Sequence, residues 1–110
     1  MARFTLAAIG LLTAFASLPG LSAEVASPAT DGYMAATAKM DADMPKNMTG
    51  DADADFAMMM VPHHQSAIDM AMVELKYGKD KKLRHMATSI IAAQKKEIAA
   101  FEAWMAAHHH

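Results

Sequence analysis

The chain has 110 residues, a formal net charge of -2 and no cysteine. This composition excludes disulfides and thiolate ligands, and it gives neither the basic footprint of a nucleic-acid-binding protein nor a polybasic membrane patch. Methionine is frequent, with 12 residues, whereas aromatic residues make up only 6% of the chain. Because methionine fills cores and also ligates soft metal ions through its thioether, composition leaves both roles open.

Residues 1–23 have the pattern of a secretory signal peptide. Arg3 provides the positive start, Phe4 to Ala16 is a nearly unbroken apolar run, and a small residue, Ala23, precedes the expected cut. The apolar run is shorter than the ~20 residues that a membrane-spanning helix needs. We therefore expect cleavage near Ala23, a periplasmic or otherwise exported protein, and no membrane insertion afterwards. A retained membrane anchor is the alternative.

The part of the chain that follows is one small domain, because about 87 residues cannot build more than one core. Residues 24–30 predict a flexible lead-in, and residues 31–44 predict a short helix that Pro45 ends or kinks. A domain of this size has a thin core. Oligomerisation, a bound metal or long packed helices must add stability.

Two long helices are expected next. The first runs from about Asp53 to Tyr77, with Gly78 as its C-cap, and the second runs from about Asp80 to Ala107. Their short connection predicts an antiparallel hairpin. No segment alternates with period two, so we expect an all-α bundle of three helices, or of four if two chains share a bundle. The helical domain covers residues 31–107, and residues 108–110 form a histidine tail that is either native or added.

The segment MMMVPHHQSAIDMA, residues 58–71, combines thioethers, imidazoles and a proline. Inside a helix Pro62 costs ~3 kcal/mol, so either a new helix starts there or the helix kinks and aims nearby groups. On a helical wheel His64 lies within the apolar face, whereas His63 points in another direction. Met59 and Met60 each lie four residues before one of these histidines and are therefore its neighbours.

Thioether and imidazole donors suit Cu(I), and we expect Cu(I) rather than Cu(II). One helix provides some of the donors, and a second element must supply the rest. The predicted copper ligands are Met59, Met60, His63, His64, Met70, His85 and Met86. The alternative for each methionine is core packing, and for His64 it is a hydrogen-bonded core histidine.

Two polar residues, Gln94 and Glu97, fall on the apolar face of the last predicted helix. A carboxylate in that position is costly unless it is paired, and His64 on the facing helix is the expected partner of Glu97. Such a bond would orient the imidazole, as carboxylates behind metal-binding histidines do. Alternatively, it is a buried polar clasp that sets the helix register.

Three segments resemble a known family: TGDADADF at 49–56, MVPHHQSAIDMA at 60–71 and AAQKKEIAAFEAWM at 92–105. The family is catalogued as domain of unknown function 305 and includes CopM-like periplasmic copper-binding proteins. The resemblance covers about residues 31–106 and implies a ferritin-like helical bundle and copper binding or resistance in the periplasm. It carries over to Met60, Pro62, His63, His64, Met70, Gln94, Glu97 and Trp104.

The residues and the resemblance together predict a periplasmic copper buffer, carrier or resistance factor. Its expected partners are copper ions, a copper exporter or another periplasmic copper protein, and a second copy of itself. The alternative is a metal-independent helical interaction module with a His64–Gln94–Glu97 clasp. We expect no catalysis, because nucleophile and phosphate-loop motifs are missing and a di-iron site would need more inward glutamates.

Overall fold

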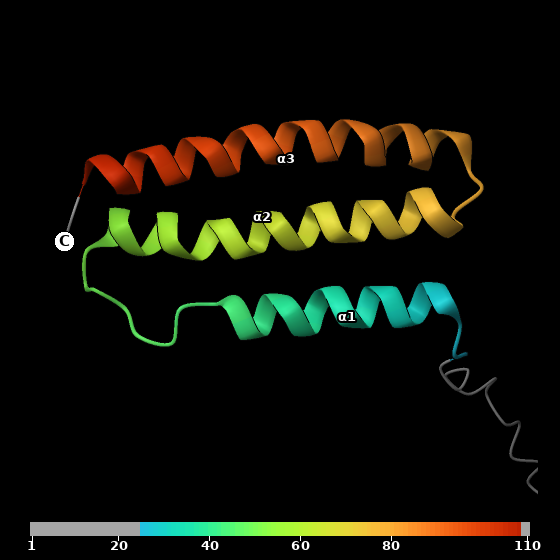
Figure 1. Cartoon of the computed structure of the whole chain (residues 1–110), viewed down its shortest axis with the longest axis horizontal. Coiled ribbons are helices and arrows are strands. Elements are labelled where there is room, and N and C mark those ends of the chain that lie inside the picture. Colours follow the sequence, from blue (N-terminus) through green and yellow to red (C-terminus); the bar gives the residue numbers. More distant parts are fainter. Residues whose placement is uncertain (1–24, 109–110) are drawn as a thin grey trace, which may run out of the picture.

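The computed structural model describes residues 25–108 and folds them into three helices (Figure 1). They are α1 (Pro28–Asp43), α2 (Ala52–Tyr77) and α3 (Lys81–Ala107). The predicted all-α class and the antiparallel α2–α3 hairpin are confirmed. No helix within these residues is both long and apolar enough to cross a membrane. The expected signal segment and the last two histidines lie outside the described residues.

The first helix begins earlier than expected, inside the segment taken as a flexible lead-in. Ser27 caps α1 by accepting a hydrogen bond from the Thr30 backbone N–H at 3.1 Å. Pro28 occupies the first helical turn, where its fixed φ suits the helix and its missing N–H costs nothing. This Ser-Pro pair is a local start signal. The helix ends at Asp43, shortly before Pro45, as predicted.

Acidic residues cap the start of α2. The Asp51 side chain accepts hydrogen bonds from the backbone N–H groups of Asp53 and Ala54. The Asp55 carboxylate accepts from the Thr49 backbone N–H at 2.7 Å and from the Thr49 hydroxyl at 2.8 Å, and it also accepts from the Gly50 N–H. These bonds, with that of the Thr49 N–H the strongest, lower the pKa of Asp55 from its ordinary value of 3.8. The loop before α2 is thereby tied to its first turn.

Helix α2 is continuous from Ala52 to Tyr77 and contains Pro62 in its interior. The alternative in which a new helix starts at Pro62 is therefore wrong. Proline in this position removes one backbone hydrogen bond and crowds the preceding turn. The chain accepts this cost because packing on two sides holds α2 in place.

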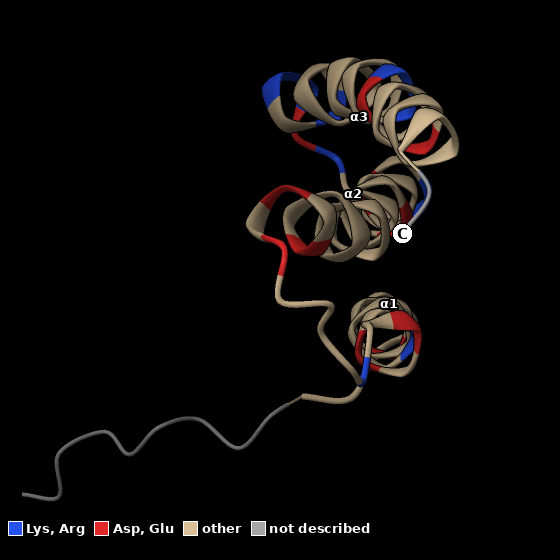
Figure 2. Ribbon diagram, turned by 90° about the vertical axis from the view of Figure 1, so that its left-hand side faces the viewer, with Lys and Arg blue, Asp and Glu red and all other residues tan. Residues whose placement is uncertain are grey.

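The three helices lie side by side in one layer, with α2 between α1 and α3 (Figures 1 and 2). Among the described residues α1 packs against α2, and its backbone does not come close to that of α3. Within residues 25–108, no further helix covers either face of the layer. One chain therefore forms a helix hairpin with a flanking helix rather than a closed bundle.

Small residues form the interior of the layer. Its buried apolar positions are Ala36, Ala54, Ala57, Ile68, Ala71 and Ala87, and no large side chain is fully buried among residues 25–108. At the α1–α2 contact, a Cβ added to Gly32 would lie only 2.8 Å from Cγ2 of Val73. Alanine and glycine let the helices approach closely, and several bulky apolar side chains, such as Phe56 and Leu83, are exposed.

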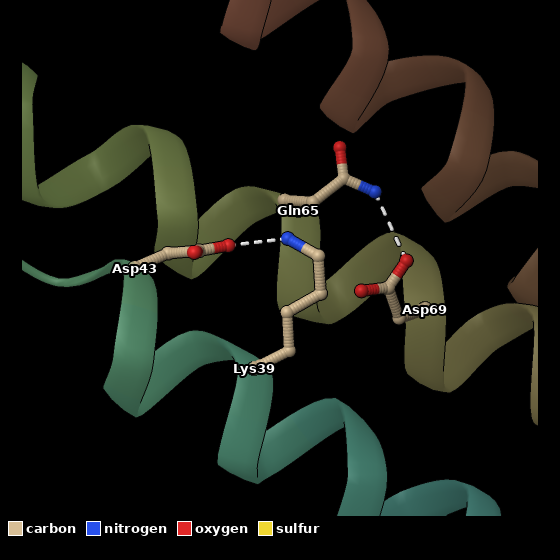
Figure 3. Close-up of polar contacts among 4 residues, drawn as sticks. All are labelled: Lys39, Asp43, Gln65 and Asp69. Carbon is tan, nitrogen blue, oxygen red and sulfur yellow. Dashed lines mark hydrogen bonds and ion pairs between the residues drawn. The ribbon is translucent and has the colours of Figure 1, made fainter.

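A polar cluster closes the other end of the α1–α2 contact (Figure 3). Lys39 of α1 pairs with Asp43 one turn later. On α2, the Gln65 amide donates to Asp69 at 3.0 Å. The hydrogen bond and the charge of Asp43 raise the pKa of Lys39 above its ordinary 10.5, and the charge of Asp69 adds a smaller contribution. The negative charge on α2 thus favours the ammonium on α1.

Candidate metal centre

The histidine pair lies at the middle of α2, and α2 is the middle helix of the layer. His64 faces α3 and is buried, with 5% of its surface exposed. Its Nε2 is hydrogen-bonded to Oε2 of Glu97, which is the partner that the sequence predicts. The side chain of Glu97 remains 56% exposed, so the pair lies at the boundary between the interior and solvent.

An aromatic ring of α3 packs against the His64 imidazole. The ring of Phe101 meets it edge to face, with centroids 5.4 Å apart, and Phe56 packs on Phe101 in the same manner at 5.6 Å. The second ring nitrogen, Nδ1, is buried and has no hydrogen-bond partner among the described residues. Leaving such a polar atom unpaired costs about 1–3 kcal/mol.

This arrangement fits a metal ligand. When a carboxylate binds one imidazole nitrogen, it fixes the tautomer and leaves the lone pair of the other nitrogen available for a metal ion. Met60 is half-buried one helical turn before His64, so a thioether lies on the same side of α2. The chemistry of this donor set, imidazole with thioether and no thiolate, suits a soft cation.

His63 points elsewhere, as the helical wheel predicts. It is exposed, its ring centroid lies 6.5 Å from that of His64, and the two ring planes differ by 59°. Met59 lies one turn before it and is half-buried. The two rings therefore point in different directions, and each histidine has its own neighbouring methionine.

Two further predicted ligands, Met70 and Met86, line one groove of about 280 Å³ between α2 and α3. Glu74 lines the same groove, and its Oε1 atom is buried without a hydrogen-bond partner among residues 25–108. The Glu74 carboxylate folds against Gly78, where an added Cβ would lie 2.1 Å from Oε1. Helical spacing cannot show a side chain that folds back over a glycine, so this position of Glu74 depends on the tertiary structure.

The remaining predicted residues are His85 and Gln94. His85 is exposed on α3, and within the described part of the chain no hydrogen bond, ion pair or ring contact joins it to another predicted ligand. Gln94 is half-buried, but no hydrogen bond among the described residues joins it to His64 or Glu97. The clasp of the alternative interpretation is thus a His64–Glu97 pair without the glutamine.

One contact escaped the sequence analysis. His108 follows the last turn of α3, and its ring stacks on Trp104 with centroids 4.2 Å apart. Its Nδ1 also lies 2.8 Å from the Trp104 carbonyl oxygen. The spacing of four residues could have indicated this pair, but the run of terminal histidines was given no structural weight.

Within residues 25–108 no three side chains of the histidine, aspartate and glutamate types converge as a metal site. The predicted ligands instead form three separate groups along the hairpin. They are the buried His64–Glu97 pair with Met60, the exposed His63 with Met59, and the Met70–Met86 groove. Each group offers two of the predicted copper ligands.

Fold and site together define a small all-α protein with a histidine- and methionine-rich central helix. The family model described as "Domain of unknown function (DUF305)" matches residues 16–105, and the chain belongs to this family. The resemblance seen in the three sequence segments is thereby confirmed at the level of the family. No curated protein matches the chain.

Proposed function

We propose that this DUF305 protein binds Cu(I) after export to the periplasm and acts there as a copper buffer, carrier or resistance factor. The observation that carries the proposal is the state of His64. Its Nε2 is bound to Glu97, its buried Nδ1 has no protein partner among the described residues, and Met60 lies one turn away. A bound soft cation would satisfy this nitrogen.

The choice of copper follows from the donors. The chain contains no cysteine, and thioether with imidazole favours Cu(I) over harder ions that prefer carboxylates and water. Within the described part of one chain, a site of three donors would have to include methionine sulfur. We assign His64 and Met60 as the buried donors, with Glu97 orienting the imidazole.

Exchange of copper with a partner needs donors that solvent can reach. His63 is exposed, Met70 is 40% exposed and Met86 is 46% exposed. These residues would accept or release the ion at the surface. The proposed partner is a copper exporter or another periplasmic copper protein. A closed ferritin-like bundle would require a further helix pair on the layer.

A competition titration with a colorimetric Cu(I) chelator tests the proposal. We expect the His63→Ala/His64→Ala double variant to bind Cu(I) much more weakly than the parent protein. Glu97→Gln should cost about 10-fold to 100-fold in affinity, as is typical when the carboxylate behind a metal-binding histidine is lost. The protein used should end at His108, so that the last two histidines cannot bind copper while the Trp104 contact is kept.

Methionine substitutions provide a matched control. Met60→Leu removes the sulfur with little change in volume, and we expect it to weaken Cu(I) binding. Met34→Leu makes the same change on α1, at a side chain that is 59% exposed, and should have no effect. Unchanged affinity in the double histidine variant would remove these histidines from the mechanism.

A metal-independent helical interaction module is the second candidate, and the exposed apolar side chains of α3 favour it. Leu83 is 51% exposed and Ile90 is 37% exposed. Thermal melts separate the two functions, because an ion that binds only the folded state must raise the melting temperature. A melt that ignores Cu(I) but rises with protein concentration would favour the interaction module.

A further inference from the structure

The α2–α3 hairpin has one face on which both helices repeat with a spacing of seven residues. Seven residues make about two helical turns, so such residues lie in line along one side of a helix. We call the surface they form the hairpin face. It consists of Phe56, His63 and Met70 on α2 and of Leu83, Ile90, Glu97 and Trp104 on α3.

The hairpin face is largely apolar and uncovered. Phe56 is 56% exposed, Leu83 is 51% exposed and Met86, beside it in the groove, is 46% exposed. A second hollow of about 350 Å³ lies at the other end of the hairpin, between Phe56 and Trp104. Contiguous exposed apolar surface on a small protein marks an interaction site, and a seven-residue repeat is the pattern of helices that pack against other helices.

The charges at the two ends of the hairpin are opposite. The start of α2 carries Asp51, Asp53 and Asp55 (Figure 2), whereas the turn into α3 carries Lys79, Lys81 and Lys82. A second copy placed head to tail on the hairpin face would set the acidic end of one chain over the lysine end of the other. A parallel placement would instead oppose like charges.

The predicted ligands also match a head-to-tail arrangement. The middle of α2 falls between His64 and Gln65; Met59 lies five residues before His64, and Met70 lies five residues after Gln65. A two-fold axis through this middle would bring both copies of His63 close to it. It would also place Met59 of one copy level with Met70 of the other, because a two-fold interface pairs each residue reciprocally.

We propose that a second copy of this chain packs head to tail on the hairpin face and completes a copper site around His63, which is exposed in the single chain. The two hairpins form a four-helix bundle, and each copy contributes His63, Met59 and Met70. The interface itself follows from the apolar face and the end charges. The completed site rests on the proposed function, since a single chain brings only one or two of these donors together.

The mass of the copper-free protein recovered from the periplasm tests the interface. We expect twice the monomer mass by light scattering at micromolar concentration. Leu83→Glu should give a monomer, whereas Met72→Glu should remain a dimer, because Met72 is 57% exposed but lies outside the seven-residue stripes. A monomeric parent protein, or a dimer that Met72→Glu breaks and Leu83→Glu does not, would overturn the interface.

Cross-linking tests the direction of packing, and the absence of native cysteine makes it clean. Asp53→Cys and Lys82→Cys proteins are mixed, unfolded, refolded together and oxidised. Head-to-tail packing predicts that the mixed disulfide dominates over either homodimer. Dominant Asp53→Cys homodimers would overturn the head-to-tail arrangement.

Copper titration of the same variants separates the interface from the function. If the parent dimer binds Cu(I) and Leu83→Glu binds at least tenfold more weakly while His64 keeps its Glu97 contact by NMR, the second copy completes the site. If the dimer forms but binds no Cu(I), the proposed function fails while the interface stands. Equal affinity in monomer and dimer overturns the shared site alone.

Discussion

His64 and Glu97 join the two long helices by a hydrogen bond between their side chains. The histidine is buried and the carboxylate is largely exposed, so the pair draws a polar group into an otherwise apolar contact. A buried imidazole with one unpaired nitrogen is a cost to the fold. A ligand bound to this nitrogen would offset that cost.

The lowered pKa of Asp55 predicts how the stability of the fold depends on pH. Its pKa is lowered in the folded protein, so its stabilising effect is present above the ordinary value of 3.8 and is lost as the pH falls through the folded value. Asp55→Asn should therefore be less stable than the parent protein at neutral pH. The difference should shrink as the pH falls below 3.8 and disappear once Asp55 is protonated in the folded protein as well. Urea unfolding at neutral and at acidic pH measures this, and an equal difference at both would contradict it.

At the level of the helices, α2 determines the geometry of the site and is itself under strain at one position. Pro62 lies immediately before His63 within a continuous helix. The proline ring crowds the preceding turn and leaves the Met58 carbonyl without its helical N–H partner. The donors most important to the proposed function thus lie beside the weakest backbone step of the helix.

Replacing that proline should stabilise the fold. Pro62→Ala restores an N–H and removes the crowding, and we expect a gain of up to about 3 kcal/mol in the free energy of unfolding. Pro45→Ala is the control, because Pro45 lies in the loop between α1 and α2. There, the loss of chain stiffness should destabilise the protein by roughly 0.4–1 kcal/mol. Chemical denaturation of both variants measures the free energy of unfolding, which should rise in Pro62→Ala and fall in Pro45→Ala.

At the scale of the whole molecule, the layer arrangement distributes stability unevenly. α2 is held on both sides, whereas α1 packs against α2 and its backbone does not come close to that of α3 among the described residues. The contact depends on a glycine that lets the helices approach and on buried Ala36. Helix α1 therefore has the fewest interactions that oppose local opening.

Native-state hydrogen exchange should reveal this order. Backbone amides in the middle of α1 should exchange faster than those in the middle of α2, because α1 can detach without opening the hairpin. Exchange measured by mass spectrometry on peptides from the two helices gives the comparison. Equal protection in both helices would show that the three helices open only as one unit.

Much of the hairpin could be read from local patterns. The caps at Asp51 and Gly78, the helical spacing of apolar residues and the divergence of His63 from His64 all depend on neighbouring residues in the chain. The His64–Glu97 pair was also predictable, because each residue is a polar interruption of an apolar face. These features can be predicted without the tertiary structure, because residues three and four apart are neighbours on the surface of a helix.

Other features depend on how the helices meet. Leu83, Met86 and Ile90 recur at helical spacing on α3, yet they are exposed at the edge of the contact. Alanines take the closest positions, and Glu74 folds over Gly78 beside the Met70–Met86 groove. Helical spacing shows which residues share a side of a helix, but not which part of that side a neighbour covers.

By itself, the sequence determined the all-α class, the long hairpin, the histidine and methionine positions and the family. Only the tertiary structure decided that one chain is a single open layer, that His64 keeps an unpartnered buried nitrogen and that the predicted ligands form separate groups. The physical reason is that local spacing sets the direction of each side chain along its own helix, whereas burial and convergence arise from the packing of residues distant in the chain.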